Sequence, residues 1–222
     1  AFSFGKTIVI SWNSKAARNR ENELTENLFK HHPSLNQNKI IFFHNQFPNL
    51  AIEGGDVMIF NSDTIFIGLS ERTKKESVEA LLPYFLDEGF SNVVGVCLPK
   101  KRTFMHLDTV LTKTDKHEYL VYDSNEQIDC YTFNESNPNG KKITLNNLSS
   151  LVSKFDDQAQ LFRCNDNEQW TCGSNALAAS PGKILLYERN ELTISNLVKE
   201  GGYKDVSFRV PRVEKNRRGR SI

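Results

Sequence analysis

The hydrophobic pattern of residues 62–98 predicts a strand, an amphipathic helix and a second strand. Residues 62–73 form an apolar run that ends in charged positions, as a strand does where it enters a loop. Residues 74–86 then have apolar side chains at helical spacing, and Gly89 suits the end of such a helix. These apolar side chains lie on one helical face: Val78, Leu81, Leu82 and Phe85. The short apolar run 92–98 follows and stops at a proline.

The same order of elements returns elsewhere in the chain. A later copy predicts a strand, a helix and a strand at residues 182–187, 192–200 and 206–210. A weaker copy at the start of the chain predicts a strand at 5–11 and a helix at 16–29. Another apolar segment lies before two of the copies, at 55–60 and 176–180. The repeated unit is therefore strand, strand, helix, strand.

Repetition of one supersecondary unit predicts an α/β fold with pseudo-symmetric copies. A radial arrangement of such copies places the loops around a common centre. We therefore expect the charged residues just beyond the strand ends to meet in one central site. Residues 124–142 are rich in Asn, Glu and Gly and predict an exposed insertion or loop.

Composition and charge narrow the class of protein. The chain has 222 residues, 38% hydrophobic and 25% charged, which predicts a soluble globular protein of one large or two small domains. Its net charge of +1 provides no overall field for nucleic acid or an anionic membrane. No apolar run reaches the roughly 18–20 residues of a membrane helix, so we expect neither a membrane nor a nucleic-acid partner.

The cysteines, the histidines and the first residues add further expectations. Four cysteines without a CxxC pair favour free thiols in the cytoplasm. The histidines lack metal-ligand spacing, so we expect no metal. Residues 1–5 have neither an initiator Met nor a secretory pattern, and we expect a processed chain or a fragment.

Three short clusters are candidates for chemistry. Glu53 and Asp56 flank two glycines, which allow backbone angles closed to other residues and a close approach between the carboxylates. Arg72 lies at a predicted strand-to-helix junction. His106 and Asp108 share one face if their segment is a strand, and such a pair can transfer protons. Taken singly, the clusters also fit a plain turn, a solvated arginine and a structural histidine.

In this order, the clusters resemble the arginine deiminase family of the guanidino-group-modifying superfamily. The strings that carry the resemblance are Ile52-Glu-Gly-Gly-Asp-Val57, Gly68-Leu-Ser-Glu-Arg-Thr73, Met105-His-Leu-Asp-Thr109, Ala17-Arg-Asn-Arg-Glu21, Glu168-Gln-Trp-Thr-Cys-Gly-Ser-Asn175 and Pro181-Gly-Lys-Ile184. The resemblance runs from residue 1 to about residue 202. It implies that residues 1–222 are a partial catalytic domain, and that the fold is part of a five-bladed α/β propeller of strand-strand-helix-strand units.

The resemblance implies hydrolysis of L-arginine to L-citrulline and ammonia, without a cofactor. It assigns Asp108 to the substrate's guanidinium, which carboxylates bind through charge-assisted hydrogen bonds. Glu53 and His106 match the acid–base pair, and Arg18 and Arg72 match the arginines that hold the α-carboxylate. In the family's reaction a cysteine thiolate attacks the guanidinium carbon. The histidine then protonates the departing ammonia and activates the water that releases citrulline.

Two parts of the family's pattern are missing. A second guanidinium-binding aspartate, in an Arg-Asp-Pro motif, would end immediately before Ala1. The nucleophilic cysteine would follow a Gly- and Arg-rich loop, but the chain ends without one. We expect Cys172 to be structural and Asp56 to support the Gly-Gly turn. Residues 212–222 predict a basic tail that is disordered, the start of the missing loop, or unrelated sequence after a truncation.

Several functions therefore remain open. The missing nucleophile favours a non-catalytic remnant that keeps the fold or a partner-binding surface. A related amidinotransferase or dimethylarginine hydrolase is another alternative, although the Glu-Arg-Thr and Met-His-Leu-Asp-Thr strings favour the deiminase. We expect the isolated 222-residue chain to be inactive. The sequence does not set the oligomeric state, and a homo-oligomer stays among the alternatives.

Overall fold

The predicted units are present in the structure, a computed structural model that describes residues 1–35, 39–124 and 126–204. One unit comprises β4 (Val57–Ile59), β5 (Thr64–Leu69), α3 (Lys75–Asp87) and β6 (Asn92–Cys97). Strand β4 is antiparallel to β5, and β5 is parallel to β6. The first unit repeats this pairing with β1 (Phe2–Phe4), β2 (Thr7–Ile10), α1 (Asn19–His31) and β3 (Lys39–Phe42). The strand-strand-helix-strand pattern is confirmed for both.

A third unit, which the hydrophobic pattern missed, lies between the copies that were predicted. It comprises β7 (Leu111–Asp115), β8 (Glu118–Val121), α4 (Leu148–Phe155) and β11 (Gln160–Arg163). Its strands pair as in the other units, with β7 antiparallel to β8 and β8 parallel to β11. The unit was not recognised because a hairpin separates β8 from α4.

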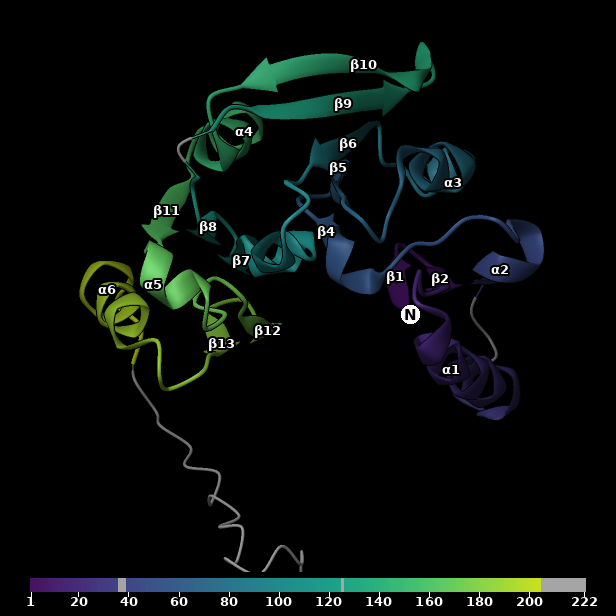
Figure 1. The fold of residues 1–222 in the computed structure, drawn as a ribbon, viewed down its shortest axis with the longest axis horizontal. Helices are drawn as coiled ribbons and strands as arrows, with labels where there is room; N and C mark the ends of the chain where they lie inside the picture. Colours follow the sequence, from purple (N-terminus) through teal and green to yellow (C-terminus); the bar gives the residue numbers. More distant parts are fainter. Residues whose placement is uncertain (36–38, 125, 205–222) are drawn as a thin grey trace, which may run out of the picture.

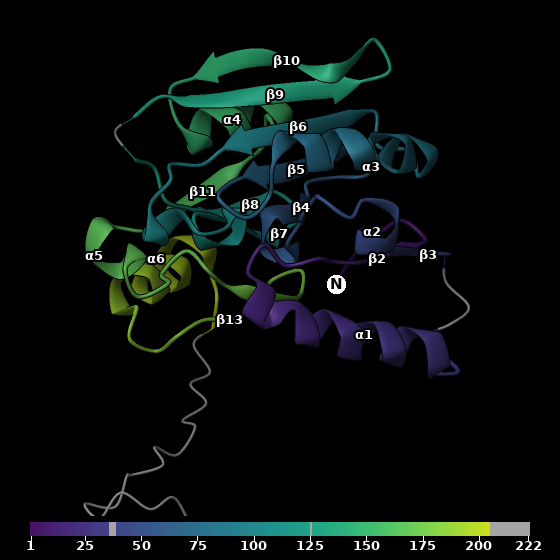
Figure 2. The same ribbon diagram turned by 45° about the vertical axis from the view of Figure 1, so that its right-hand side comes forward.

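That hairpin decides between the two alternatives for residues 124–142, because the segment is an insertion with its own strands and not a loop. It consists of β9 (Ile128–Asn134) and β10 (Asn137–Leu145), and β9 pairs with β6. The resulting five-stranded sheet has the order β10-β9-β6-β5-β4, so the hairpin extends the sheet of the preceding unit (Figure 2). Most of β10 faces solvent, as is common for an edge strand, and its polar residues therefore resemble a loop in sequence.

The units follow one another in an arc. Helices α1, α3, α4 and α6 (Glu191–Gly201) lie on its outside, and the first strand of each unit lies toward the inside (Figure 1). The fourth unit is described as far as β12 (Leu177–Ser180), β13 (Lys183–Leu185) and α6. The predicted strand at 206–210 and the tail at 212–222 lie outside the described residues. The α/β class is thus confirmed, and the expectation that the chain is part of a five-bladed propeller stays a prediction.

The core is shared between neighbouring units. The predicted apolar face of α3 is confirmed, because Val78, Leu81, Leu82 and Phe85 are all buried. Strand β5 is buried over nearly its whole length, as expected for a strand with neighbours on both edges. A second cluster joins β5 and β6 to β8 and α4. Within the described residues, no helix is both long and apolar enough to cross a bilayer.

Short elements connect these strands and helices. They are η1 (Ala16–Arg18), α2 (Phe43–Gln46), η2 (Gly54–Asp56), η3 (Arg102–Phe104), η4 (Leu107–Thr109) and α5 (Asp166–Gln169). Three of them, η1, η2 and η4, begin or end next to the candidate residues of the sequence.

Candidate active site

The strand pairing brings the candidate residues to one edge of the central sheet. Strands β5 and β6 are parallel, so the segments that follow them leave at the same edge, and these contain Arg72 and His106. Because β4 is antiparallel to β5, its first residue is at that edge too, directly after Glu53 and Asp56. The segment after β2 adds Arg18 from the neighbouring unit. The expectation that charged residues beyond the strand ends meet is therefore confirmed for these two units, whereas Arg189 of the last unit binds the Thr171 carbonyl instead.

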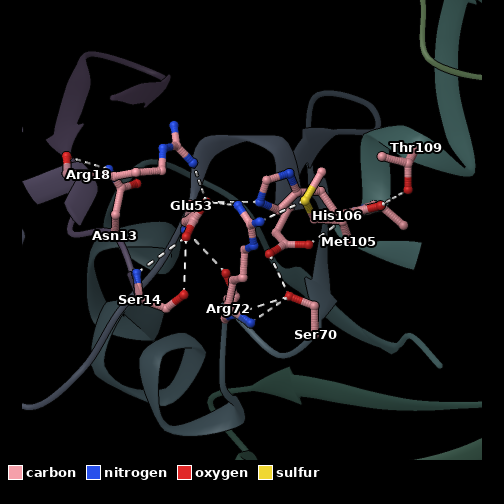
Figure 3. Close-up of polar contacts among 12 residues, drawn as sticks. Asn13, Ser14, Arg18, Glu53, Ser70, Arg72, Met105, His106 and Thr109 are labelled. Atoms are coloured by element: carbon pink, nitrogen blue, oxygen red, sulfur yellow. Dashed lines mark hydrogen bonds and ion pairs between the residues drawn. The ribbon is translucent and has the colours of Figure 1, made fainter. Parts of the chain in front are cut away.

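Glu53 is the centre of the polar network (Figure 3). Its Oε2 lies 3.0 Å from His106 Nε2 and accepts hydrogen bonds from Arg72 Nη1 at 3.0 Å and Arg18 Nη1 at 3.1 Å. Its Oε1 accepts hydrogen bonds from the amide and hydroxyl groups of Ser14, both at 3.3 Å. The Glu53 side chain is 3% exposed. This buried carboxylate is thus held by donors from three separate segments.

These donors control the ionisation of Glu53. Burial by itself raises the pKa of the carboxyl group, but the hydrogen bonds from His106 and Arg72 outweigh it and lower the pKa to about 2. Glu53 is therefore ionised at neutral pH. Since an ionised carboxylate only accepts, the His106 Nε2–H donates in this pair, and the histidine's other nitrogen faces away from Glu53.

Gly55 provides the space in which His106 and Asp108 lie. A Cβ atom on Gly55 would be 2.8 Å from Asp108 Oδ2 and 2.9 Å from His106 Nδ1, closer than real Cβ contacts. Neither Gly54 nor Gly55 has a positive φ angle. The expectation that these glycines supply unusual backbone angles is therefore wrong. What matters at Gly55 is the close approach of two side chains.

The segment that contains His106 and Asp108 also differs from the strand that was expected. It is not a strand: His106 has extended backbone angles and precedes the short helix η4, which contains Asp108. The two side chains share a side of the chain because both pack over Gly55, and not because of strand alternation. The proximity was predicted for the wrong geometric reason.

Asp108 presents an unused oxygen beside this network. Its Oδ1 is buried and has no hydrogen-bond partner among the described residues. Burial raises the pKa of Asp108, and the nearby His106 and Asn175 oppose that rise. The residue lines a cavity of about 770 Å³ that also borders Gly55. A buried carboxylate oxygen without a donor suits a cationic ligand with hydrogen-bond donors, such as a guanidinium.

The cavity continues away from Glu53 along the inner strands. Its wall is formed by β4, β7 and β12, and it includes Lys113 and Lys116. Arg18, Arg72 and His106 do not line it. Asp108 and Gly55 are therefore the point at which the cavity meets the Glu53 network.

Asp56 supports more than the turn in which it lies. Its fully buried carboxylate accepts hydrogen bonds from Ser70 Oγ at 2.9 Å and from the Leu107 amide at 3.0 Å. Ser70 Oγ in turn accepts the amide hydrogens of Arg72 and Thr73. Burial raises the pKa of Asp56 to about 6, against the opposing hydrogen bonds and the charge of His106. Asp56 therefore has a wider role than the predicted support of the Gly-Gly turn. Its hydrogen bonds also hold the turns that contain Arg72 and His106.

Several residues of the site had no role in the sequence interpretation. Ser14 binds Glu53, Ser70 binds Asp56, and Asn175 donates to the Asp108 carbonyl at 2.9 Å. Met105 Sδ lies 2.7 Å from Arg72 Nη2. Ser70, Met105 and Asn175 stand within the strings that carry the family resemblance, which was the available signal. Ser14 had none, because it is one polar residue in a loop after β2.

The cysteines do not supply an evident thiolate. Burial raises the pKa of the Cys97 thiol, that of Cys130 to about 12 and that of Cys164 to about 11. Cys130 is in the hydrophobic core. Cys172 lies in a turn with a φ of 64°. Among the described residues, no group of three or more His, Cys, Asp or Glu side chains could hold a metal ion.

Known proteins with similar sequences cover most of this chain. A model of the arginine deiminase family matches residues 1–212. The chain is 34% identical to the arginine deiminase of Borrelia garinii subsp. bavariensis, over 97% of this chain and 55% of that protein. It is 32% identical to the arginine deiminase of Mycoplasma capricolum subsp. capricolum, over 89% of this chain and 52% of that protein. The chain thus spans about half the length of the curated relatives it matches.

Solved structures share the fold at lower sequence identity. The amidinotransferase SxtG from Microseira wollei has a TM-score of 0.61 at 17% identity, covering 90% of this chain and 60% of that one. The product-bound N-terminal domain of ArgZ, a cyanobacterial arginine dihydrolase, has a TM-score of 0.59 at 17% identity, with coverages of 90% and 62%. DDAH from Pseudomonas aeruginosa, complexed with citrulline, has a TM-score of 0.54 at 18% identity, with coverages of 86% and 60%.

Proposed function

The chain belongs to the arginine deiminase family, and we propose that its site binds L-arginine and provides the acid–base part of arginine hydrolysis. The observation that carries this proposal is the Glu53–His106 contact of 3.0 Å beside the unpartnered Asp108 oxygen. The ionised carboxylate of Glu53, the imidazole of His106 and the carboxylate of Asp108 therefore lie close together. Deimination requires a grip on a guanidinium and a group that moves protons nearby.

Each candidate residue has a distinct role in this proposal. Asp108 binds the guanidinium, because its buried oxygen needs a charged donor. His106 protonates the departing ammonia and then accepts a proton from water, while ionised Glu53 orients and stabilises the imidazole. Arg18 and Arg72 receive the α-carboxylate. Asp56 contacts none of the reacting atoms in this scheme and is a positioning residue.

The reaction of the family also needs a thiolate, and three of this chain's four cysteines do not favour one. Burial holds the pKa of three of the four thiols above the usual range, which disfavours the nucleophilic form. This observation favours a second function for the 222-residue chain, namely arginine binding without turnover. The complete reaction is proposed for a protein in which a suitable thiol joins these residues.

Isothermal titration calorimetry with L-arginine tests the binding proposal. We expect weak binding to the 222-residue chain and its loss in Asp108→Ala, because that change removes the carboxylate from the guanidinium position. Asp129→Ala is the matched control, since Asp129 lies on β9 and pairs with Lys142 outside the site. Equal heats for wild type and Asp108→Ala would contradict the assignment of Asp108. Loss of binding in both variants would indicate a nonspecific effect.

A further inference from the structure

The two arginines assigned to the substrate's carboxylate already share a carboxylate within the protein. Arg18 Nη1 and Arg72 Nη1 both donate to Glu53 Oε2, at 3.1 and 3.0 Å (Figure 3). We propose that Glu53 is an internal competitor for these arginines, and that a ligand's carboxylate takes their donors from it. Glu53 would then weaken the binding of ligands that have a carboxylate and leave the binding of ligands without one unchanged. This inference rests on the proposed function.

The hydrogen bonds of Arg72 leave one side of its guanidinium open to exchange. Nη1 binds Glu53, whereas Nη2 points at the thioether sulfur of Met105 at 2.7 Å. A thioether is a weak acceptor, so a carboxylate oxygen is a better partner for that nitrogen. A bidentate grip on a ligand's carboxylate would use both nitrogens and would draw Nη1 away from Glu53.

Arg18 has a comparable arrangement on the other side of Glu53. Its Nε and Nη2 bind Glu21 at 3.2 and 2.9 Å, and only Nη1 reaches Glu53. Glu21 therefore holds the guanidinium in place while leaving the Nη1 arm free to change partner. The contact with Glu53 is the one that a ligand can replace without detaching Arg18 from α1.

The exposure of the side chains allows a ligand to replace contacts of the two arginines but not to displace Glu53. The Arg18 and Arg72 side chains are 42% and 18% exposed, while that of Glu53 is 3% exposed. A ligand can therefore reach the guanidinium groups from solvent. The hydrogen bond from Ser14 holds the Glu53 side chain in place, and Glu53 keeps its contact with His106. The exchange would change the charge around Glu53 without moving it.

The exchange couples carboxylate recognition to the acid–base pair. Two cationic donors would leave Glu53, and His106 and Ser14 would remain. Loss of nearby positive charge makes a carboxylate bind protons more strongly, so the pKa of Glu53 should rise. The other charged groups near this network are Glu21 and the amino group of Ala1, which face Arg18, and Asp56 and Asp108, which face His106. L-Arginine and agmatine both bring a guanidinium to Asp108 in the proposed function, so a difference between the two ligands reports the exchange at the two arginines.

The first test follows the ionisation of Glu53 by carboxyl ¹³C NMR between pH 3 and 7, with the signal assigned by its absence in Glu53→Gln. Without ligand, the signal should stay that of an ionised carboxylate over this range. Saturating L-arginine should raise the pKa of Glu53 by about one unit, to the lower end of the observed range, so that its protonation becomes detectable near pH 3. Agmatine, which is arginine without its carboxylate, should leave the signal unchanged.

The second test measures affinity in Glu53→Gln, which removes the competing charge. L-Arginine should bind this variant roughly five- to tenfold more tightly than wild type, while agmatine binding changes by less than about twofold. Asp129→Asn is the control, because it removes a carboxylate that pairs with Lys142 outside the site. It should leave the affinities for L-arginine and agmatine unchanged.

The outcomes separate this inference from the proposed function. If L-arginine binds wild type but leaves the Glu53 titration unchanged, or if agmatine shifts it equally, the competition is wrong while arginine binding stands. If L-arginine binds neither wild type nor Glu53→Gln, the proposed function fails and the inference fails with it. If Glu53→Gln does not fold, the NMR titration of wild type, assigned through its contact with His106, still decides.

Discussion

At the scale of single residues, this site depends on how closely side chains approach one backbone position. His106 and Asp108 both lie over Gly55, within 3 Å of where a Cβ atom would be. Both residues also have a role in the proposed function. His106 contacts Glu53, and Asp108 has a buried oxygen without a hydrogen-bond partner among the described residues. The absence of a side chain at residue 55 is therefore part of the site's geometry.

Gly55→Ala tests that dependence. The added methyl group should displace both side chains, and L-arginine affinity should fall by at least about tenfold, on the order of 1.4 kcal/mol. Calorimetry measures the affinity, and circular dichroism checks the fold. Gly54→Ala is the matched control in the same turn, because its Cβ would meet the Ala1 carbonyl at 3.1 Å and neither functional side chain. Equal losses in the two variants would mean that the turn and not the close approach matters.

At the scale of elements, one buried carboxylate joins the segments that carry the site. Asp56, at the end of η2, binds Ser70 in the turn from β5 to α3 and Leu107 at the start of η4. These turns carry Arg72 and His106. The relative position of the arginine and the histidine thus depends on a residue that is distant in sequence from both.

The pH dependence of stability should report Asp56. Burial raises its pKa in the folded protein to about 6, above the usual 3.8, so the folded state binds the proton more strongly than the unfolded chain. Its contribution is therefore largest below pH ~4 and is lost as pH rises through ~6. Urea unfolding at pH 4, 5, 6 and 7 should show this decline in wild type relative to Asp56→Asn. The exposed Asp157→Asn is the control. If the unfolding free energies of wild type and Asp56→Asn changed with pH in parallel, Asp56 would not be the cause of the decline.

At the scale of the whole molecule, repeated units place their loops around the inside of an arc (Figure 1). The site is assembled from two adjacent units, since Ser14 and Arg18 follow β2 whereas Glu53, Arg72 and His106 surround the sheet of β4, β5 and β6. The third and fourth units contribute β7 and β12 to the wall of the cavity at Asp108. Arginine recognition in this proposal is therefore a property of several units together.

The isolated 222-residue chain should release no measurable citrulline from L-arginine. General acid–base assistance alone supplies roughly 10²–10⁴-fold, whereas enzymes usually reach 10⁶-fold or more. Burial raises the pKa of three of the four thiols, Cys97, Cys130 and Cys164, which disfavours the thiolate that each would need to form the covalent intermediate. A colorimetric citrulline assay measures this. Turnover that disappears in Cys172→Ser would identify that residue as the nucleophile, and turnover that survives it would contradict the proposed mechanism.

The sequence by itself determined the elements whose signals are local. The periodicity of α3 located its buried face, and short apolar runs located β5 and β6, because burial of one helix face or one central strand appears directly in residue spacing. The motif strings identified the family and the five candidate residues, four of which contact one another through Glu53.

Only the tertiary structure decided how those residues act together. Glu53 and His106 are 53 positions apart, so their contact depends on strand order and register, which local spacing does not encode. Strand β10 was missed because an exposed edge strand has no apolar pattern. The role of Gly55 and the pairing of both arginines with Glu53 were likewise hidden, since each depends on side chains that meet across separate segments.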